Sequence, residues 1–461
     1  MSESNEKSSR VEFNGQAPAL VDRVVNLMAD SGNVILNMSH EQACQAVRSG
    51  NAEAVRKIRG QFAICEQQGK TIRMARSIGR PMRYFLAKRA EGPALIIAER
   101  MSEIVDQLKK EGLADQFHPS YTRMVPAHYL LELQLVGCPD PNPQLTRYFA
   151  PERNRLPADI NAIGATYIER LAEVVDQFLM SIPDDQPIGV MFSGGIDSGS
   201  ILVLVDYLMR RRGHSPSRIK AFTLAVQGQP GDLDQSRKFL KAINLEMLLE
   251  PVEVPVASVR WQDAVESIED YKPLDVQSAT MGYAMLRALR ARYPQWRYLI
   301  DGDGGDENLK DYPIEENPEL TIRSVLGNRM LYQEGWGVDA VKHSLVYSGG
   351  QSRGHSRTSA PAAQFGFTGF SPYAVPDVIE IAEAVPFVAL TEWDHQKLYA
   401  LKGEIVAAGI RHVTGVDMPV FEKRRFQHGA VDKPTFEKMF PKDNQVYRDE
   451  FARMIESKCA E

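Results

Sequence analysis

Residues 188–198 have the sequence IGVMFSGGIDS, in which an apolar segment leads into a glycine-rich turn. We expect a buried strand at 188–192 and a helix from about Gly199 to Arg211, because apolar residues dominate both segments. A strand, a loop and a helix in this order form one unit of a parallel sheet. Similar units follow, with strands expected at 219–226, 246–252 and 298–300 and helices at 233–243 and 279–292. The fold class predicted for the chain beyond residue 160 is therefore α/β with a parallel sheet.

The glycine-rich turn after the first strand suits a polyphosphate. Hydroxyl groups and unobstructed backbone amides gather at the positive end of a helix, from Ser193, Gly194, Gly195 and Ser198. Asp197 would repel phosphate unless a divalent cation lay between them, which indicates Mg²⁺. The alternative is a glycine-rich turn with a helix-capping serine. The lysine-bearing P-loop pattern is absent from this turn, so it is a different kind of phosphate loop.

A second glycine-rich turn, DGDGGDE at residues 301–307, follows the strand expected at 298–300. Ligands of open α/β sheets bind at the carboxyl ends of the strands. The two turns, although far apart in the sequence, could therefore face one pocket.

Bulk composition limits the kind of protein. A chain of 461 residues is expected to form two or three domains. Its net charge of −6 and pI near 5.9 argue against a nucleic-acid partner. No apolar run approaches the roughly 18 residues of a membrane span. We expect a cytoplasmic enzyme with a disordered tail at residues 1–16, and a homodimer stays open as an oligomeric state.

The turn SGGIDS after an apolar strand resembles the pyrophosphate loop of the N-type ATP pyrophosphatases, in particular the asparagine synthetase family with its β-lactam synthetase relatives. Residues 299–307 resemble the second glycine loop of that family, and residues 222–224 resemble the strand that frames its adenine. Residues 421–429 resemble the loop with its intermediate-stabilising lysine. The resemblance implies an ATP-pyrophosphatase (adenine nucleotide α-hydrolase-like) synthetase domain at residues 160–461.

The resemblance also implies roles for individual residues. Asp197 and Asp306 would ligate the metal, and Lys423 would stabilise the charge that develops during adenylation. ATP would be held by Ser193, Gly194, Gly195, Asp197, Ser198, Thr223, Leu224 and Gly302. For Lys423 the alternative is a solvated basic patch. Lys402 lies in a segment similar to the family's Lys-x-x-Leu-Arg helix, from which residues 404–405 depart, and its alternative is a lysine that snorkels to solvent.

Two acidic residues bear on the attacking amine. Asp303 replaces the glutamate of asparagine-forming relatives and the tyrosine of β-lactam-forming relatives, and its carboxylate could orient or deprotonate an amine. Glu334 lies about as far beyond the second turn as the second member of the lactam-forming dyad, with a surface helix glutamate as the alternative.

Residues 17–150 are expected to form a separate α+β domain, with a crossing to the next domain in the Pro- and Asn-rich segment 138–157. Residues 57–104 resemble the glutaminase domain of glutamine-dependent synthetases. Ser77 stands where that family has an aspartate, and the chain starts Met-Ser rather than Met-Cys. Because that chemistry needs an N-terminal cysteine, we expect a degenerate Ntn-like domain and a nitrogen source other than glutamine.

Together these features predict an ATP-dependent, AMP-forming carbon–nitrogen ligase. It would adenylate a small-molecule or peptide carboxylate and pass the acyl group to an amine, ammonia or an internal amine. Two alternatives stay open: a nucleotide- or tRNA-modifying pyrophosphatase and a catalytically inactive nucleotide-binding scaffold. The absence of a basic domain argues against the first, and intact Asp197, Asp306 and Lys423 argue against the second.

Overall fold

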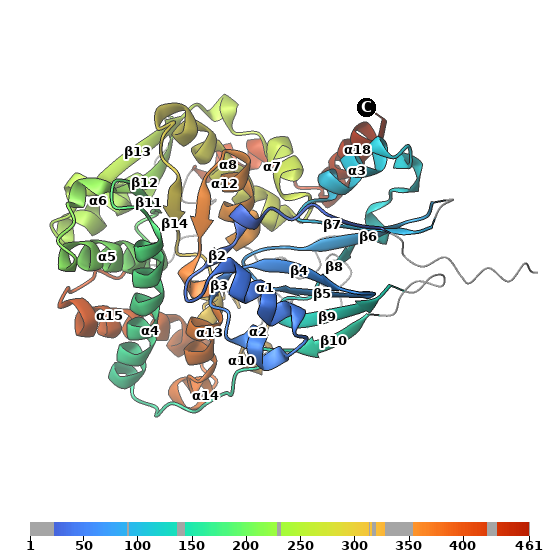
Figure 1. Ribbon diagram of the computed structural model, residues 1–461. Coiled ribbons are helices and arrows are strands. Elements are labelled where there is room, and N and C mark those ends of the chain that lie inside the picture. The colour runs from blue at the N-terminus through green and yellow to red at the C-terminus, as the bar shows by residue number, and fades with distance from the viewer. Residues whose placement is uncertain are drawn as a thin grey trace, which may run out of the picture.

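The computed structural model describes residues 23–89, 92–135, 143–227, 232–312, 314–315, 320–327, 354–421 and 431–460. Figure 1 shows two stacked sheets from the first third of the chain on one side of the molecule and a parallel sheet on the other. None of the helices in these ranges combines the length and the apolar character that a membrane crossing requires.

The N-terminal part is a sandwich of two four-stranded sheets with helices on both outer faces. One sheet has the order β1-β7-β6-β8 and the other β10-β9-β5-β4. The strands are β1 (Arg23–Asn26), β4 (Ala63–Gln68), β5 (Thr71–Arg76), β6 (Arg83–Ala87), β7 (Ala94–Ala98), β8 (Arg123–Met124), β9 (Tyr129–Gln134) and β10 (Gln144–Arg147), with a separate pair, β2 (Val34–Ile35) and β3 (Gly60–Gln61). The helices are α1 (His40–Arg48), α2 (Ala52–Arg56) and α3 (Met101–Lys110).

Alternating side chains produce this layering. On β5, Ile72 and Met74 face Leu95 and Ile97 of β7 in the core between the sheets. Strand β10 lies within the Pro- and Asn-rich segment 138–157, and its residues 144–147 pair with β9 at the edge of a sheet. An edge position tolerates the neighbouring prolines because one side of the strand has no ladder to interrupt.

The C-terminal part is built on a five-stranded sheet with the order β13-β12-β11-β14-β15, in which every pair is parallel. This confirms the expected α/β class. The strands are β11 (Ile188–Met191), β12 (Ile219–Val226), β13 (Leu249–Val254), β14 (Tyr298–Ile300) and β15 (Thr368–Phe370). The helices are α4 (Ile160–Ser181), α5 (Ile196–Arg211), α6 (Asp232–Ala242), α7 (Trp261–Ile268), α8 (Pro273–Arg292), α9 (Gly305–Asn308), α10 (Ile322–Gly327), the π-helix η7 (His355–Ser359), α12 (Ala360–Gln364), α13 (Pro376–Glu383), α14 (Phe387–Thr391), α15 (His395–Thr414), α17 (Lys433–Met439) and α18 (Asn444–Ala460).

Several elements differ from expectation, and helix α8 begins at Pro273 and not at residue 279. Helix α5 begins at Ile196, not near Gly199, because Gly195 already has the extended backbone of an N-cap. Residues 246–248 form a 3₁₀ turn, so strand β13 starts at Leu249. Strand β15 was not expected at all, because it is short and lies in a segment rich in Gly and Pro.

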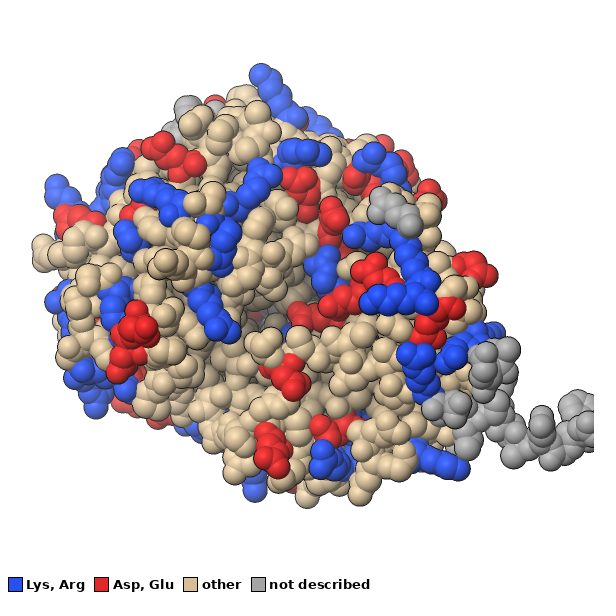
Figure 2. All heavy atoms as spheres, turned by 45° about the horizontal axis from the view of Figure 1, so that its top comes forward, with Lys and Arg blue, Asp and Glu red and all other residues tan. Residues whose placement is uncertain are grey.

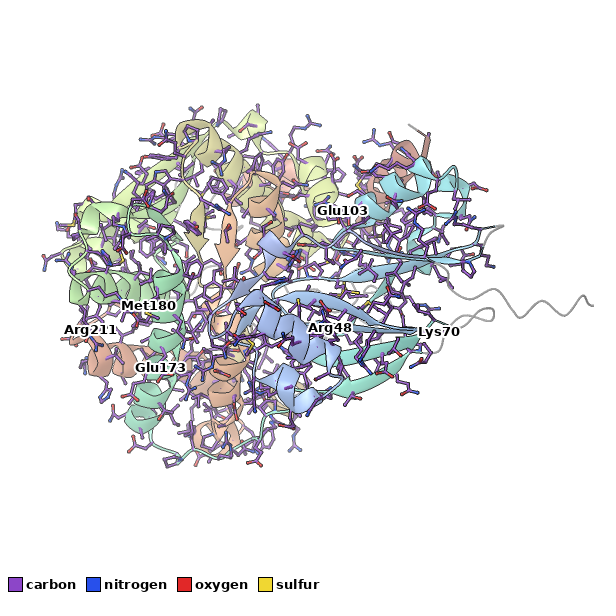
Figure 3. The ribbon with its side chains drawn as sticks, in the orientation of Figure 1. Arg48, Lys70, Glu103, Glu173, Met180 and Arg211 are labelled. Atoms are coloured by element: carbon purple, nitrogen blue, oxygen red, sulfur yellow. The ribbon has the colours of Figure 1, made fainter. Side chains whose placement is uncertain are left out.

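Helix α15 packs across α4 on the outside of the parallel sheet (Figure 1). The two helices approach so closely that a Cβ at Gly164 would lie 2.5 Å from the carbonyl oxygen of Ile405. A Cβ at Gly409 would likewise overlap the backbone of Gly164. Figure 3 labels Glu173 and Met180, which lie on α4 and reach solvent. The close backbone approach at Gly164 and Gly409 sets the position of α15 against α4.

Candidate functional site

The two glycine-rich turns lie side by side because their strands are neighbours. Ile188 of β11 pairs with Tyr298 of β14, and each strand leads directly into its turn. A Cβ at Gly302 would lie 2.6 Å from the amide nitrogen of Ser198. Because Gly302 has no side chain, the backbone of the second turn contacts the start of α5, which follows the first turn. The position of both turns after strands had indicated this proximity.

The first turn is held by its own hydroxyl groups. The Ser193 and Ser198 hydroxyl oxygens are 3.2 Å apart, and the Gly195 amide donates to the Ser193 hydroxyl at 3.4 Å. Gly194 has a φ of +71°, and a Cβ there would lie 2.8 Å from the Ser236 amide nitrogen. The turn thus presents backbone amides and two hydroxyls at the N-terminus of a 16-residue helix.

Helix α6 supports the turn from behind, which the sequence did not reveal. The Gln235 side-chain amide donates to the Gly194 carbonyl oxygen at 3.1 Å. The Thr223 hydroxyl donates to the Phe192 carbonyl oxygen at 2.9 Å and lies 3.3 Å from the Ser236 hydroxyl oxygen. Thr223 and Leu224, expected to bind nucleotide, are buried on β12.

Lys402 joins the two turns electrostatically. Its Nζ lies 2.6 Å from Asp197 Oδ2 in the first turn, hydrogen-bonds to Asp306 of the second turn, and lies 3.5 Å from Asp311 Oδ2. The side chain is 3% exposed, so the snorkelling alternative is wrong. Burial alone would lower the pKa of Lys402, but the three carboxylates raise it well above its usual value. Lys402 is therefore a charged ammonium at the centre of the site.

The donors of this centre suit Mg²⁺ only in combination with a phosphate ligand. Within the ranges that the structure describes, no group of three or more His, Cys, Asp or Glu side chains could hold a metal by itself. Asp197 and Asp306 already converge on one cation, the Lys402 ammonium. Mg²⁺ is commonly held by one or two carboxylates together with substrate phosphates and water. The carboxylate pair fits that arrangement.

A buried layer lies behind the carboxylates. The Ser200 hydroxyl lies 2.6 Å from the Tyr373 hydroxyl and donates to the Asp197 carbonyl oxygen at 2.7 Å. The Asn308 amide donates to the Tyr373 carbonyl at 2.9 Å. Burial raises the pKa of Tyr373, so its hydroxyl stays protonated. This layer ties α5, the second turn and the segment after β15 together.

Asp303 makes a different set of contacts from those expected of a base. Its Oδ1 lies 2.8 Å from Arg357 Nη1, and its Oδ2 accepts a hydrogen bond from the Thr358 hydroxyl at 2.7 Å. Both partners belong to η7, which the sequence did not single out. The two other expected site residues, Lys423 and Glu334, lie outside the described residues.

A cavity of about 550 Å³ lies at the other end of α5. Its walls include Tyr207, Arg211 and Val416. Figure 3 labels Arg211, which belongs to the last turn of α5. The cavity is thus a helix length away from the glycine-rich turn and is not part of this site.

A family model matches the part of the chain that contains both turns, and two known proteins are similar to about a third of the chain. Residues 168–351 match the family model described as asparagine synthase. A probable glutamine-hydrolysing asparagine synthetase of Acanthamoeba polyphaga mimivirus is 26% identical over 164 residues, which is 35% of this chain and 27% of that protein. Asparagine synthetase B of Escherichia coli (strain K12), also glutamine-hydrolysing, is 26% identical over 196 residues, or 37% of this chain and 34% of that protein. The matches thus span about a third or less of these relatives.

Proposed function

We propose that this chain, of which residues 168–351 match the asparagine synthase family model, is an ATP-dependent, AMP-forming carbon–nitrogen ligase. A carboxylate oxygen attacks the α-phosphorus of ATP, and pyrophosphate leaves. An amine then attacks the carbonyl carbon of the acyl-adenylate, and AMP leaves as the amide forms. The observation that supports this best is the centre of Lys402, Asp197 and Asp306, which unites the two glycine-rich turns.

Each part of the site has a place in this reaction. The amides and hydroxyls of the turn at Ser193–Ser198 would bind the departing pyrophosphate. Asp197 and Asp306 would hold Mg²⁺, which neutralises phosphate charge when bound. The Lys402 ammonium would orient these two carboxylates and offset their charge while the anionic ATP enters. Lys423 stays the proposed cation for the developing negative charge, and Glu334 a candidate for the amine step.

We propose further that the N-terminal sandwich is a degenerate Ntn-like domain with no glutaminase activity. The Ser77 hydroxyl, at the position of the family's aspartate, bonds to the backbone of Phe62 and is fully buried. Burial raises the pKa of Cys44 and of Cys65 to about 12, so neither thiol is a ready nucleophile. Ammonia or an amino substrate would then supply the nitrogen.

Exchange of radioactive pyrophosphate into ATP tests the ligase. Exchange should require Mg²⁺ and a carboxylic acid, and Asp197→Ala should abolish it. Circular dichroism without ATP should show that the Asp197→Ala protein is still folded. Glu173→Ala on the exposed face of α4 is the matched control and should exchange normally. ATP binding without exchange across a broad acid panel would favour the scaffold alternative. Glutamate release from glutamine during turnover would contradict a degenerate N-terminal domain.

A further inference from the structure

The cavity of about 550 Å³ lies where three helices of the parallel-sheet part end. The second half of α5 forms one wall, the residues directly after α6 form another, and the end of α15 with the residues after it forms the third. Small-molecule sites commonly have volumes of about 300–1,000 Å³. Figure 3 shows Arg211, one of the lining residues, on the side of the molecule away from the N-terminal sandwich. The cavity thus has the size of a small-molecule site.

The lining of the cavity combines buried apolar residues with exposed basic ones. Val203 and Leu245 are buried. Asp206 accepts hydrogen bonds from Arg210 Nε through both carboxylate oxygens, at 2.9 and 2.8 Å, so these two charges offset each other. Arg211 is exposed, and its side chain makes no ion pair or hydrogen bond with another residue that the structure describes. The described lining residues therefore carry one positive charge that has no counter-charge.

Two neutral polar side chains in the lining are also available to a ligand. The Tyr207 hydroxyl and the Asn244 amide make no hydrogen bond to any part of the chain that the structure describes. The carbonyl oxygens at the helix ends are less available, because the turns after the helices cap them. After α6, for example, the Leu245 amide donates to the Leu240 carbonyl oxygen at 2.9 Å. The lining therefore suits an anion with an apolar body better than a metal cation.

All three helices that line the cavity also reach the first glycine-rich turn. Helix α5 begins in that turn and carries Asp197. Gln235 of α6 donates to the Gly194 carbonyl oxygen at 3.1 Å. Lys402 of α15 lies 2.6 Å from Asp197 Oδ2, and α15 packs against α5. A ligand that changes the spacing of the three helix ends therefore acts on the same elements that position the turn, because helices move as rigid units.

We infer that this cavity is an effector site for a small organic carboxylate with an apolar body. The carboxylate pairs with Arg211, whose planar guanidinium matches its geometry, and the apolar body lies against Val203 and Leu245. Occupation of the cavity changes the affinity of the glycine-rich turn for ATP through α5, α6 and α15. This coupling rests on the proposed function, since it requires that the turn binds ATP. The binding of the carboxylate itself does not.

Fluorine NMR with a matched pair of probes tests the site. The wild-type protein should bind para-trifluoromethylbenzoate saturably, and para-trifluoromethylbenzyl alcohol roughly two- to fivefold more weakly, as expected for an exposed charge pair. Arg211→Gln should remove this difference, whereas Arg453→Gln, at an exposed arginine of α18, should keep it. Val416→Trp, which places a large side chain in the cavity, should abolish binding of both probes. Circular dichroism should show that each variant is folded.

The coupling is tested by the Kd of the benzoate with and without saturating ATP and Mg²⁺. The two values should differ by about fivefold or more, because coupling between two sites is reciprocal. Equal values would overturn the coupling. Absence of saturable binding to the wild type would overturn the whole inference, and so would binding that folded Val416→Trp retains, because the probe would then occupy another site. Failure of ATP itself to bind would contradict the proposed function and the coupling, but not the carboxylate site.

Discussion

At the scale of single residues, the buried ammonium of Lys402 decides the charge balance of the site. It faces Asp197, Asp306 and Asp311, which come from two different turns and the segment after the second. Removing the buried cation from such a group leaves carboxylates without their counter-charge. The same lysine therefore supplies the counter-charge of the two carboxylates that we propose to hold Mg²⁺.

Lys402→Met should lower the free energy of unfolding by about 3–5 kcal/mol, because three carboxylates lose their buried counter-charge. Urea denaturation measures the loss. Millimolar Mg²⁺ should restore more stability to this variant than to the wild type. Lys442→Met, at a lysine that is 78% exposed, is the control and should change little. Equal stability of Lys402→Met and the wild type would show that the three carboxylates do not depend on this cation.

Two buried histidines should make the protein sensitive to mild acid. Burial lowers the pKa of His128 and of His355 to about 3. The unfolded chain, with histidine pKa values of about 6.5, takes up protons first as the pH falls, so stability present near neutral pH is lost below about pH 6.5. From pH 7.5 to 5.5 the two together should cost about 2–3 kcal/mol.

His128 allows this prediction to be isolated. Neither of its ring nitrogens has a hydrogen-bond partner among the described residues, and its ring packs at 4.9 Å from that of Phe149. His128→Phe should therefore remove about half of the pH dependence. Urea denaturation at both pH values measures it. An identical slope in wild type and variant would place the acid sensitivity elsewhere.

At the scale of elements, the crossing of α4 and α15 determines where Lys402 lies. Gly164 and Gly409 bring the two backbones together. Lys402 lies on α15, so this packing determines the position of its side chain. No sequence pattern indicates this crossing, because the two glycines lie in different helices. Glycine in a helix interior ordinarily costs stability relative to alanine, so two such glycines signal close packing only once the partner is known.

Gly409→Ala should destabilise the protein by about 1–3 kcal/mol through overpacking, although alanine favours helices. It should also weaken pyrophosphate exchange, because α15 would shift Lys402 from the carboxylates. Gly327→Ala, where a Cβ meets nothing within 4 Å, is the control and should be neutral or slightly stabilising. Thermal unfolding and exchange assays measure both effects. A Gly409→Ala protein as stable as the control would mean that the helices can separate at no cost.

The glycine-rich turns and the parallel strands could be predicted because their signals are local. An apolar segment followed by SGGIDS or DGDGGDE defines both the end of a strand and the start of a helix. Arg357 and Gln235 could not be predicted, because each acts on a turn that is distant in the sequence. Lys402 was suspected, but its burial depends on carboxylates from separate segments. A motif within one segment can be recognised in a sequence, whereas the meeting of side chains from distant segments cannot.

At the scale of the whole molecule, buried charges join the N-terminal sandwich to the parallel-sheet part. Glu269, at the end of α7, accepts from the backbone amides of Met101 and Ser102 at 2.7 and 2.8 Å. It thereby caps α3 of the sandwich, and Arg100 lies 3.5 Å away. Figure 2 shows acidic and basic side chains interspersed over the face in view.

Glu269→Gln should uncouple the two parts. Burial would raise the pKa of Glu269, but Arg100, Arg83 and the two amides lower it, so the residue is charged and its loss leaves the arginines uncompensated. We expect a lower midpoint of thermal unfolding and a transition that splits in two, followed by differential scanning calorimetry. Glu437→Gln, at an exposed ion pair with Lys442, is the control. A single unshifted transition would contradict the coupling.

Helix α18 packs on α3 at the outer face of the sandwich (Figure 1). Tyr447, Phe451 and Ile455 share a core with Met101 and Ile104, and the entire parallel sheet lies between them in the sequence. During synthesis the ribosome therefore releases the sandwich long before the helix that covers it. The apolar face of α3 that α18 covers therefore stays uncovered during translation until α18 has emerged from the ribosome.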